Sequence, residues 1–574
     1  MRRFVVAALA VLLSSPALPQ TQADPEAATG FTPKPVATGQ RHMIVTANPL
    51  ATDAGLEVLR DGGSAADATI AALLVLNVVE PQSSGIGGGA FALVHGPNGL
   101  TSWDARETAP TGANPDMFLE DGEPLPFLEA VRSGRSIGVP GLVALMAELH
   151  DRHGVLDWPR LFRPAITLAD QGFPVSPRLA GLLERFGDRL AGTDAAAVFL
   201  PGGEPLVEGQ ILRQTELART LRKIATQGKE AFYLMGLARD IAAAAQRTPR
   251  PGTLSSADLA GYQVVERAPV CHPFRGYRVC GMGPPSSGAT TVGQILMILD
   301  RFKPDELELE EPRLWHLFAE ASRLAYADRA RYLADEDFVK VPVKGLLDPS
   351  YIAERSILLS GFEASVEKAQ AGEPPWREGR LYAPALPQDS PGTTHLSVID
   401  ETGLAISLTA SIETAFGSGR MAGGFLLNNQ LTDFSFRPVD GPGLPIANAV
   451  ASGKRPRSSM APTIAYLGDT PVVLTGSPGG SRIPEYVAGS LIAILGFERD
   501  PAEAAALFHV SQRNRGEVVV EPGTPPAVTD GLRERGHAVT ERDMTSGLGI
   551  ITIRPDGTLL GGADPRREGV AAGD

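Results

Sequence analysis

The sequence predicts a globular protein of the α/β class, and three observations lead to this prediction. Of the 574 residues, 43% are hydrophobic and 21% are charged, which is the content of a folded chain rather than a disordered one. From Met43 onward, short apolar stretches typical of strands alternate with longer stretches that have helical spacing. From Thr393 onward, the strand-like stretches predominate.

The chain begins with a predicted secretory signal. Two arginines are followed by ten apolar residues (4–13), which are too few to span a bilayer. Small residues follow, and cleavage after Ala17 or after Ala23 is compatible with the pattern. We therefore expect a signal peptide over residues 1–23 and a periplasmic or secreted protein. Residues 24–42 are polar and proline-bearing, and we expect them to form a loose N-terminal arm.

Charge and composition argue against several classes of partner. The formal net charge is -14 and no run of lysines and arginines is present, so nucleic acid and anionic membrane surfaces are not expected partners.

The nine histidines are scattered along the sequence. His150 and His153 have i,i+3 spacing, but the run around them is typical of a solvated helix end. We expect no metal and no cofactor.

Helical segments are predicted at three places in the first 340 residues. Residues 65–80 are apolar nearly all round, which favours a buried helix, and residues 140–245 are mainly helical with proline and glycine breaks. Pro312 opens a long amphipathic helix. The glycine-rich run at 85–89 resembles a nucleotide-binding loop, but a helix precedes it and a strand follows it. Close backbone packing is therefore the better interpretation.

The two cysteines, Cys271 and Cys280, flank the sequence HPFRGYRV. In an oxidising compartment a bridge across a strand-turn-strand unit is plausible. Two buried free thiols fit the sequence nearly as well, so the pattern leaves both states open.

The peptide bond between Gly392 and Thr393 carries the main chemical prediction. A threonine hydroxyl is a poor nucleophile unless the α-amine of the same residue takes its proton, and this amine has a pKa of about 7.7–8. Such chemistry requires cleavage before Thr393, and Gly392 tolerates the distorted backbone that self-cleavage needs. The preceding residues, 371–392, are rich in proline and glycine and are expected to be extended and exposed. The alternative is a strand that starts with two β-branched residues.

The run from Thr393 to Glu413 predicts a hairpin with a three-residue loop that contains Gly403. If Asp400 faces the first residue of the second strand, Thr393 lies opposite Ser411. Alternation then puts Ser411 and Glu413 on one polar face with the proposed nucleophile. The alternative is a sheet edge with one solvated face.

Two loops in the last 130 residues have the composition of ligand-binding loops. Gly479 and Gly480 follow an apolar strand, and adjacent glycine amides in such a turn can hold a developing oxyanion. A plain tight turn is the alternative. The basic loop at 454–459 offers cations and two hydroxyls that could hold a carboxylate, although such loops are often only solvated.

Several long motifs in a fixed order resemble the γ-glutamyltransferase (γ-glutamyltranspeptidase) family. They cover nearly everything from Met43 to the C-terminus: ANPLATDAGLEVLRDGGSAADA, EPQSSGIGGGAF, WDARETAP, GPPSSGATT, GTTHLSVID, FLLNNQLTDFS, GKRPRSSMAPTI and LTGSPGGSRI. The resemblance implies an N-terminal-nucleophile hydrolase with a four-layer αββα sandwich. It also implies a precursor that cleaves itself into a large chain (43–392) and a small catalytic chain (393–574), which together form one heterodimeric unit.

The resemblance also implies the reaction and the site. Members attack the γ-glutamyl amide of glutathione and related compounds, form a γ-glutamyl-enzyme ester, and pass the acyl group to water or to an amino acid or peptide acceptor. The implied residues are Thr393 as nucleophile with its freed amine as base, Ser411 as a second hydroxyl, Gly479 and Gly480 for the oxyanion, Arg106 with Ser458 and Ser459 for the substrate α-carboxylate, and Glu413, Gln430 and Asp433 around its α-amine.

Two departures from the family pattern affect the expected activity. Glu413 stands where many members have asparagine, and residues 436–453, which form an aromatic-bearing lid in some members, contain neither tyrosine nor tryptophan. We therefore expect hydrolysis to compete well with transfer.

Three other functions fit the sequence less well. A glutaryl-cephalosporin acylase of the same family would place an acyl group without an ammonium near Asp433 and Glu413, which is unfavourable. A relative that transfers poly-γ-glutamate chains is less compatible with a pocket for a terminal zwitterion. A non-catalytic secreted binding protein would remain one unbroken chain.

Overall fold

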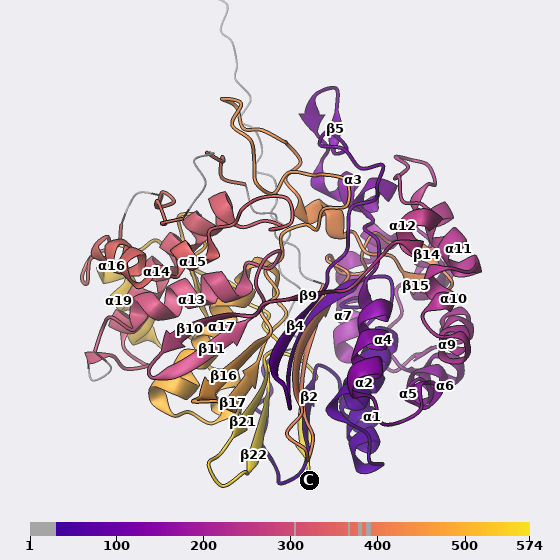
Figure 1. Cartoon of the computed structure of the whole chain (residues 1–574), viewed down its shortest axis with the longest axis horizontal. Helices are drawn as coiled ribbons and strands as arrows, with labels where there is room; N and C mark the ends of the chain where they lie inside the picture. Colours follow the sequence, from indigo (N-terminus) through magenta and orange to yellow (C-terminus); the bar gives the residue numbers. More distant parts are fainter. Residues whose placement is uncertain (1–29, 304–305, 366–367, 377–380, 386–391) are drawn as a thin grey trace, which may run out of the picture.

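The computed structural model describes residues 30–303, 306–365, 368–376, 381–385 and 392–574, so the predicted signal peptide (1–23) lies outside the described residues. Two seven-stranded antiparallel sheets are stacked face to face between two layers of helices (Figure 1). The predicted α/β class and αββα sandwich are therefore confirmed.

The first sheet has the order β1 (Ala37–Gly39), β22 (Leu559–Ala563), β21 (Gly549–Ile553), β17 (Thr470–Thr475), β16 (Thr463–Leu467), β11 (Tyr277–Gly281) and β10 (Val270–Phe274). The second has the order β23 (Val570–Gly573), β2 (Met43–Thr46), β12 (Thr393–Ile399), β13 (Ala405–Ser411), β3 (Gly89–Gly96), β4 (Gly99–Ala105) and β9 (Val265–Arg267).

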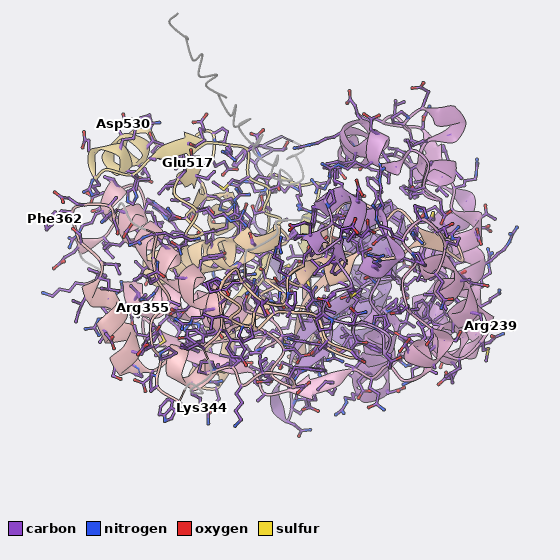
Figure 2. All side chains as sticks on the ribbon, turned by 90° about the horizontal axis from the view of Figure 1, so that it is seen from above. Arg239, Lys344, Arg355, Phe362, Glu517 and Asp530 are labelled. Atoms are coloured by element: carbon purple, nitrogen blue, oxygen red, sulfur yellow. A yellow bond between two sulfur atoms is a disulfide. The ribbon has the colours of Figure 1, made fainter. Side chains whose placement is uncertain are left out.

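Helices cover the outer face of each sheet. The second sheet packs against α1 (Pro49–Arg60), α2 (Ala65–Val79) and α4 (Leu142–His153), and the first sheet packs against α13 (Gly288–Leu299), with α17 (Ile483–Leu491) and α14 (Pro312–Tyr332) packed on α13 (Figure 1). Seen from above, charged side chains such as Arg239, Glu517 and Asp530 project from the periphery (Figure 2).

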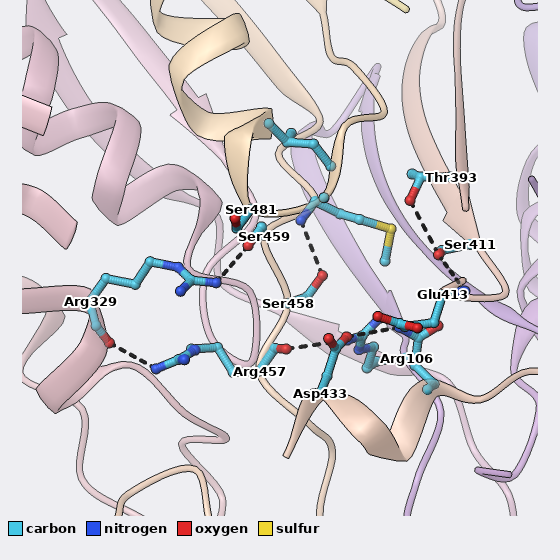
Figure 3. A pocket seen from close by; sticks show the side chains of 14 residues that line it. Arg106, Arg329, Thr393, Ser411, Glu413, Asp433, Arg457, Ser458, Ser459 and Ser481 are labelled. Atoms are coloured by element: carbon cyan, nitrogen blue, oxygen red, sulfur yellow. Dashed lines mark hydrogen bonds and ion pairs between the residues drawn. The ribbon is translucent and has the colours of Figure 1, made fainter. Parts of the chain in front are cut away.

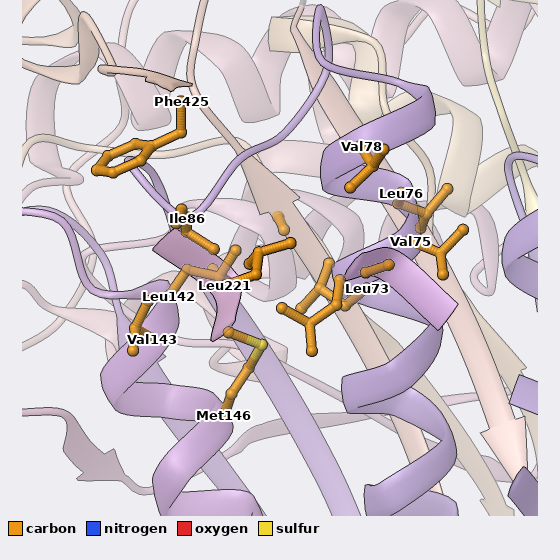
Figure 4. Packing of buried hydrophobic residues seen from close by; sticks show 14 of the residues in the cluster. Leu73, Val75, Leu76, Val78, Ile86, Leu142, Val143, Met146, Leu221 and Phe425 are labelled. Atoms are coloured by element: carbon orange, nitrogen blue, oxygen red, sulfur yellow. The ribbon is translucent and has the colours of Figure 1, made fainter. Parts of the chain in front are cut away.

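The predicted helices are found where the sequence placed them. Every residue of α2 is buried, and its N-terminus is closed by a capping box between Ser64 and Asp67. Figure 4 shows leucines and valines of α2 in one cluster with side chains of α4. Between residues 140 and 245 the chain is mainly helical, and Pro312 is the first residue of α14.

The remaining helices and strands lie around this framework. The helices are α3 (Phe127–Arg132), α5 (Trp158–Leu161), α6 (Arg163–Gln171), α7 (Pro177–Leu190), α8 (Ala196–Phe199), α9 (Thr215–Gln227), α10 (Glu230–Tyr233), α11 (Gly236–Ala245), α12 (Ser256–Ala260), α15 (Val343–Leu346), α16 (Pro349–Ile357), α18 (Pro501–Ala506) and α19 (Pro526–Glu534). The strands are β5 (Leu119–Glu120), β6 (Glu123–Pro124), β7 (Phe173–Pro174), β8 (Ile211–Leu212), β14 (Met421–Ala422), β15 (Phe425–Leu426), β18 (Val510–Ser511), β19 (Val518–Val520) and β20 (Val539–Glu541).

The glycine run at 85–89 packs backbone against backbone. A Cβ atom on Gly87 would lie 2.2 Å from the carbonyl oxygen of Leu426, and one on Gly88 would lie 2.2 Å from that of Ser411. Real Cβ atoms do not approach this closely, so these positions accept only glycine. The structure thus agrees with the packing interpretation.

The described part of the predicted N-terminal arm is held in place rather than loose. Residues 37–39 form β1, which pairs with β22. The amide of Thr32 donates to the carbonyl of Pro565 at 3.0 Å, and Lys34 Nζ donates to the carbonyl of Arg567 at 2.7 Å. The prediction of a loose arm was wrong for these residues, because edge pairing and the hydrogen bonds of the half-buried Lys34 amine outweigh their polar composition.

Cys271 and Cys280 face each other across the β10–β11 hairpin and form a disulfide. Of the two states that the sequence left open, the structure therefore contains the bridge.

Among the described helices, none is both long enough and apolar enough to cross a bilayer.

The hairpin that carries Thr393 lies at the centre of the second sheet, and its register is the predicted one. Thr393 pairs with Ser411, and β12 and β13 are flanked by β2 and β3. Ser407 Oγ donates across to the carbonyl of Thr475 in the first sheet at 3.0 Å, while Leu408 on the opposite face joins the cluster that packs on α2. Every residue of both strands is buried, so the alternative of a solvated face was wrong.

Candidate active site

A single pocket brings together nearly all the residues that the sequence singled out (Figure 3). It lies beside the start of β12 and the end of β13, between the two sheets. The predicted residues that line it are Arg106, Thr393, Ser411, Glu413, Gln430, Asp433, Ser458, Ser459 and Gly480. Gly479 precedes a lining residue, and Gly392 is bonded directly to Thr393.

Thr393 and Ser411 lie side by side in this pocket. The Thr393 hydroxyl donates to Ser411 Oγ at 3.3 Å, and Ser411 Oγ donates to the carbonyl of Gly392 at 2.7 Å. The amide of Glu413 donates to Ser411 Oγ at 2.9 Å, which holds this hydroxyl in place. The Ser411 hydroxyl therefore contacts both residues of the Gly392–Thr393 bond: the carbonyl of Gly392 and the hydroxyl of Thr393.

Glu413 lies in the turn after β13, so its side chain is directed into the pocket by this turn and not by the alternation of side chains along the strand. β13 ends at Ser411, and Glu413 has a φ of +82°, a left-handed backbone conformation that is rare for a residue with a side chain. Its buried carboxylate accepts a hydrogen bond from Asn429 Nδ2. The predicted strand-face position was thus wrong in detail, although the residue does line the pocket.

Arg106 and Asp433 form an ion pair in the pocket. Arg106 follows β4, and its Nη2 donates to Asp433 and to the carbonyl of Arg457, while its Nε donates to the carbonyl of Pro456 at 3.2 Å. Asp433 ends the short 3-10 helix Gln430–Asp433 and also accepts from Gln430 Nε2 at 2.9 Å. Arg106 Nη1 is buried and has no hydrogen-bond acceptor among the described residues, and it lies 3.9 Å from the carboxylate of Glu107.

The cations of the basic loop are structural. Lys454 Nζ donates to the carbonyls of Ala447 and Ala449, and burial lowers its pKa to about 8. Arg455 pairs with the buried carboxylate of Asp104 at 2.6 Å. Arg457 Nη1 donates at 3.1 Å to the carbonyl of Arg329, near the C-terminal end of α14, where a cation is favourable. The hydroxyls of Ser458 and Ser459, which line the pocket, are therefore the candidates in this loop for binding a ligand carboxylate.

Sequence reasoning missed Arg329, which lines the same pocket. Its Nε donates to Ser287 Oγ at 2.8 Å and its Nη2 to Ser459 Oγ at 2.6 Å. The sequence does contain one indication of its burial. Arg329 lies on α14, three residues after Tyr326 and three before Tyr332, and the apolar spacing predicts that this face of the helix is buried. The other lining residues outside the prediction are Arg457, Met460, Ser481 and Ile483.

The turn after β17 has the backbone conformation that only glycine adopts readily. Gly479 has a φ of +132° and Gly480 a φ of +59°, and a Cβ atom on Gly479 would lie 2.4 Å from the ring of Tyr486. Among the described residues, no acceptor takes a hydrogen bond from the amide of Gly479 or Gly480.

Within the part of the chain that the structure describes, no group of three or more His, Cys, Asp or Glu side chains is placed to hold a metal ion.

Glu107, next to Arg106, is a buried acid with an altered pKa. Neither of its carboxyl oxygens has a hydrogen-bond partner among the described residues, and Arg106 Nη1 lies 3.9 Å away. Burial raises the pKa of Glu107 from 4.5 to about 8, against the opposing effect of Arg106. The folded protein therefore holds this proton at neutral pH, whereas the unfolded chain releases it.

Glu107→Gln is expected to flatten the dependence of stability on pH. Because the folded pKa is raised, the contribution of Glu107 to stability is complete below pH 4.5 and is lost as the pH rises through about 8. The wild-type free energy of unfolding should fall by roughly 2 kcal/mol between pH 6 and pH 8 from this group alone. Denaturant unfolding at both pH values measures it, and an equal decline in the two proteins would contradict the assignment.

Comparison with known proteins agrees with this geometry. The model of the Gamma-glutamyltranspeptidase family matches residues 51–574. The chain is 38% identical over 552 residues to the glutathione hydrolase proenzyme of Bacillus subtilis (strain 168), covering 94% of this chain and 92% of the relative. It is 37% identical over 539 residues to the glutathione hydrolase proenzyme of Escherichia coli (strain K12), with 91% and 90% covered. The solved structure of the cephalosporin acylase from Bacillus halodurans matches with a TM-score of 0.84 at 28% identity, covering 96% of this chain and 99% of that one. The chain therefore belongs to the γ-glutamyltranspeptidase family.

Proposed function

We propose that this protein is a self-cleaving γ-glutamyltransferase and glutathione hydrolase whose nucleophile is the Thr393 hydroxyl. The observation that carries the proposal is the placement of Thr393 beside Ser411 in a pocket that also contains Arg106, Glu413 and Asp433. Both curated relatives named above are glutathione hydrolase proenzymes, and a proenzyme is consistent with cleavage into a large and a small chain.

The contacts around the Gly392–Thr393 bond support the proposed self-cleavage. Thr393 Oγ attacks the carbonyl carbon of Gly392, the C–N bond breaks, and the hydroxyl proton passes to the departing nitrogen. The resulting ester is then hydrolysed by water, which leaves a carboxylate on Gly392 and a free α-amine on Thr393. Ser411 Oγ donates to the carbonyl oxygen on which negative charge develops during the attack.

Ser411→Ala is expected to slow self-cleavage by about 10²- to 10³-fold, because one hydrogen bond to the developing oxyanion is lost. Ser411→Thr keeps the hydroxyl and should be cleaved at close to the wild-type rate. Denaturing gels of freshly refolded precursor, sampled over time, measure the rate. Equal rates in the alanine variant and the wild type would show that Ser411 does not act on this bond.

In the mature enzyme the freed amine of Thr393 has a pKa suited to a general base near neutral pH. It takes the proton from Thr393 Oγ as this oxygen attacks the γ-carbonyl of the substrate. The amides of Gly479 and Gly480 then bind the oxyanion, and the leaving amine departs with the proton. The γ-glutamyl ester is finally resolved by water or by the amine of an acceptor.

The charges in the pocket favour a γ-glutamyl over a glutaryl head group. The Arg106 guanidinium, which lines the pocket, is matched to the α-carboxylate, whereas the carboxylates of Glu413 and Asp433 are matched to an α-ammonium. The similarity to a cephalosporin acylase keeps the glutaryl acylase as the second candidate. Hydrolysis of γ-glutamyl-p-nitroanilide faster than glutaryl-p-nitroanilide supports our proposal, and the reverse order supports the acylase.

The loop at 436–453 lies beside the pocket, where Asn448 Nδ2 donates to the carbonyl of Asp433 at 2.7 Å and Asn448 Oδ1 accepts from the amide of Arg457 at 2.9 Å. Phe436 stacks on Phe118 with ring centroids 4.5 Å apart, the amide of Ile446 donates to the carbonyl of Pro438, and no residue of this loop is among those that line the pocket. The ester is thus open to water, and we propose that hydrolysis competes well with transfer. Equal p-nitroaniline release with and without excess dipeptide acceptor is the expected result, and a several-fold stimulation by the acceptor at neutral pH would contradict it.

Export through the signal peptide at residues 1–23 is part of the proposal. The division into a large chain (43–392) and a small chain (393–574) is another part. Fractionation of producing cells tests export, and N-terminal sequencing of both mature chains tests the two cleavage positions.

A further inference from the structure

Arg329 is the pocket residue whose contacts are not explained by the proposed reaction. It lies in the last turn of α14, its side chain is only 5% exposed, and its guanidinium points toward the loop that carries Ser458 and Ser459 (Figure 3). Because α14 precedes Gly392 and the serines follow it, this contact joins the two chains that cleavage would produce.

The two serine hydroxyls each accept a hydrogen bond. Ser459 Oγ accepts from Arg329 Nη2 at 2.6 Å, and Ser458 Oγ accepts from the amide of Met460 at 3.1 Å. A hydroxyl has one hydrogen to donate, and it cannot direct this hydrogen toward the group from which it accepts. Among the described residues, no acceptor takes a hydrogen bond from either hydroxyl. Both hydrogens therefore remain for an acceptor in the pocket.

Arg329 also fixes the backbone of this loop through Ser287. Its Nε donates to Ser287 Oγ, and Ser287 Oγ in turn donates to the carbonyl of Ser458 at 2.7 Å. The amide of Ser287 donates to the same carbonyl at 2.9 Å. One planar guanidinium thus orients the Ser459 hydroxyl directly and holds the adjacent residue through a second serine.

We propose that Arg329 is a positioning residue for the carboxylate of the substrate. By donating to Ser459 Oγ, it directs the hydrogen of this hydroxyl into the pocket, and its charge strengthens the hydroxyl as a donor to an anion. The inference rests on the proposed γ-glutamyl function. Under it, Arg329, in the proposed large chain, contributes to recognition of the α-carboxylate through the hydroxyl of Ser459, in the proposed small chain.

The test compares two anilides that differ only in the α-carboxylate, γ-glutamyl-p-nitroanilide and 4-aminobutyryl-p-nitroanilide. For γ-glutamyl-p-nitroanilide, Arg329→Gln should raise KM by about tenfold, the effect of one oriented hydrogen bond to a charged group, with kcat within about twofold of the wild type. For 4-aminobutyryl-p-nitroanilide, kcat/KM should change by less than about twofold. Arg331→Gln, on the same helix but outside the pocket, is the matched control and should behave as the wild type.

A double-mutant cycle with Ser459→Ala separates positioning from a structural effect. If Arg329 acts through Ser459, the variant with both changes should have the same KM for γ-glutamyl-p-nitroanilide as Ser459→Ala alone. Independent effects of the two changes, or an equal loss for both anilides, would overturn the proposal. An unchanged KM in Arg329→Gln would overturn this inference alone, whereas a wild-type protein without activity on γ-glutamyl-p-nitroanilide would overturn the proposed function itself.

Discussion

Replacing Thr393 by alanine is expected to give a single uncut polypeptide with no activity on γ-glutamyl amides. The alanine has no hydroxyl to attack the carbonyl of Gly392, so the precursor keeps its peptide bond and no α-amine is released at residue 393. Both the nucleophile and its base are then absent, and the remaining pocket residues have no group to acylate. Denaturing gels, mass measurement and a γ-glutamyl-p-nitroanilide assay on the same preparation measure the three consequences.

The adjacent residue provides the matched control. Thr394 is buried, and its hydroxyl has no hydrogen-bond partner among the described residues. Thr394→Val keeps the shape of the side chain and removes only this hydroxyl, so the variant should be cleaved and active. Thr393→Ser keeps a hydroxyl and should be cleaved, at a reduced rate. A Thr393→Ala protein that still turns over substrate as one unbroken chain would disprove the proposed nucleophile.

The β12–β13 hairpin could be predicted from the sequence because its register depends on local chemistry. The loop with Gly403 fixes which residues face each other, and the alternation of polar and apolar residues assigns the two faces of the strands. The Thr393–Ser411 pair follows from these two features alone. The sequence did not show that the polar face would be buried, because its hydroxyls are satisfied by carbonyls of the first sheet, in segments distant along the chain.

The rest of the site depends on contacts between distant segments. The contact between Arg329 and Ser459 joins residues 130 positions apart, and it exists because the end of α14 packs on the basic loop. The left-handed backbone of Glu413 is not a local preference of glutamate, and Asn429 contacts both the Glu413 carboxylate and the amide of Thr414. Arg455 was predicted as a candidate anion ligand, but its buried partner Asp104 lies on β4, far away along the chain.

Arg106→Gln is expected to lower kcat/KM for γ-glutamyl-p-nitroanilide by on the order of 10²–10³-fold. Hydrogen bonds to charged groups contribute about 1.5–3 kcal/mol each, and the substrate α-carboxylate loses one or two of them. The change also leaves Asp433 without its ion-pair partner, which adds a repulsive charge close to the bound carboxylate. Steady-state kinetics on the cleaved enzyme measure the loss, which should appear in KM more than in kcat, because the carboxylate is bound in the ground state as well as in the transition state.

Arg106→Lys separates charge from geometry at this position. Lysine keeps the charge next to Asp433 but has neither the planar fork nor the reach to hold the carbonyls of Pro456 and Arg457 together with a ligand. We expect it to recover part of the lost kcat/KM, by about tenfold over the glutamine variant. For 4-aminobutyryl-p-nitroanilide, which has no α-carboxylate, both variants should differ little from the wild type. If the glutamine variant loses activity equally on both anilides, Arg106 supports the pocket rather than binding the carboxylate, and the assignment of the α-carboxylate to this side of the pocket fails.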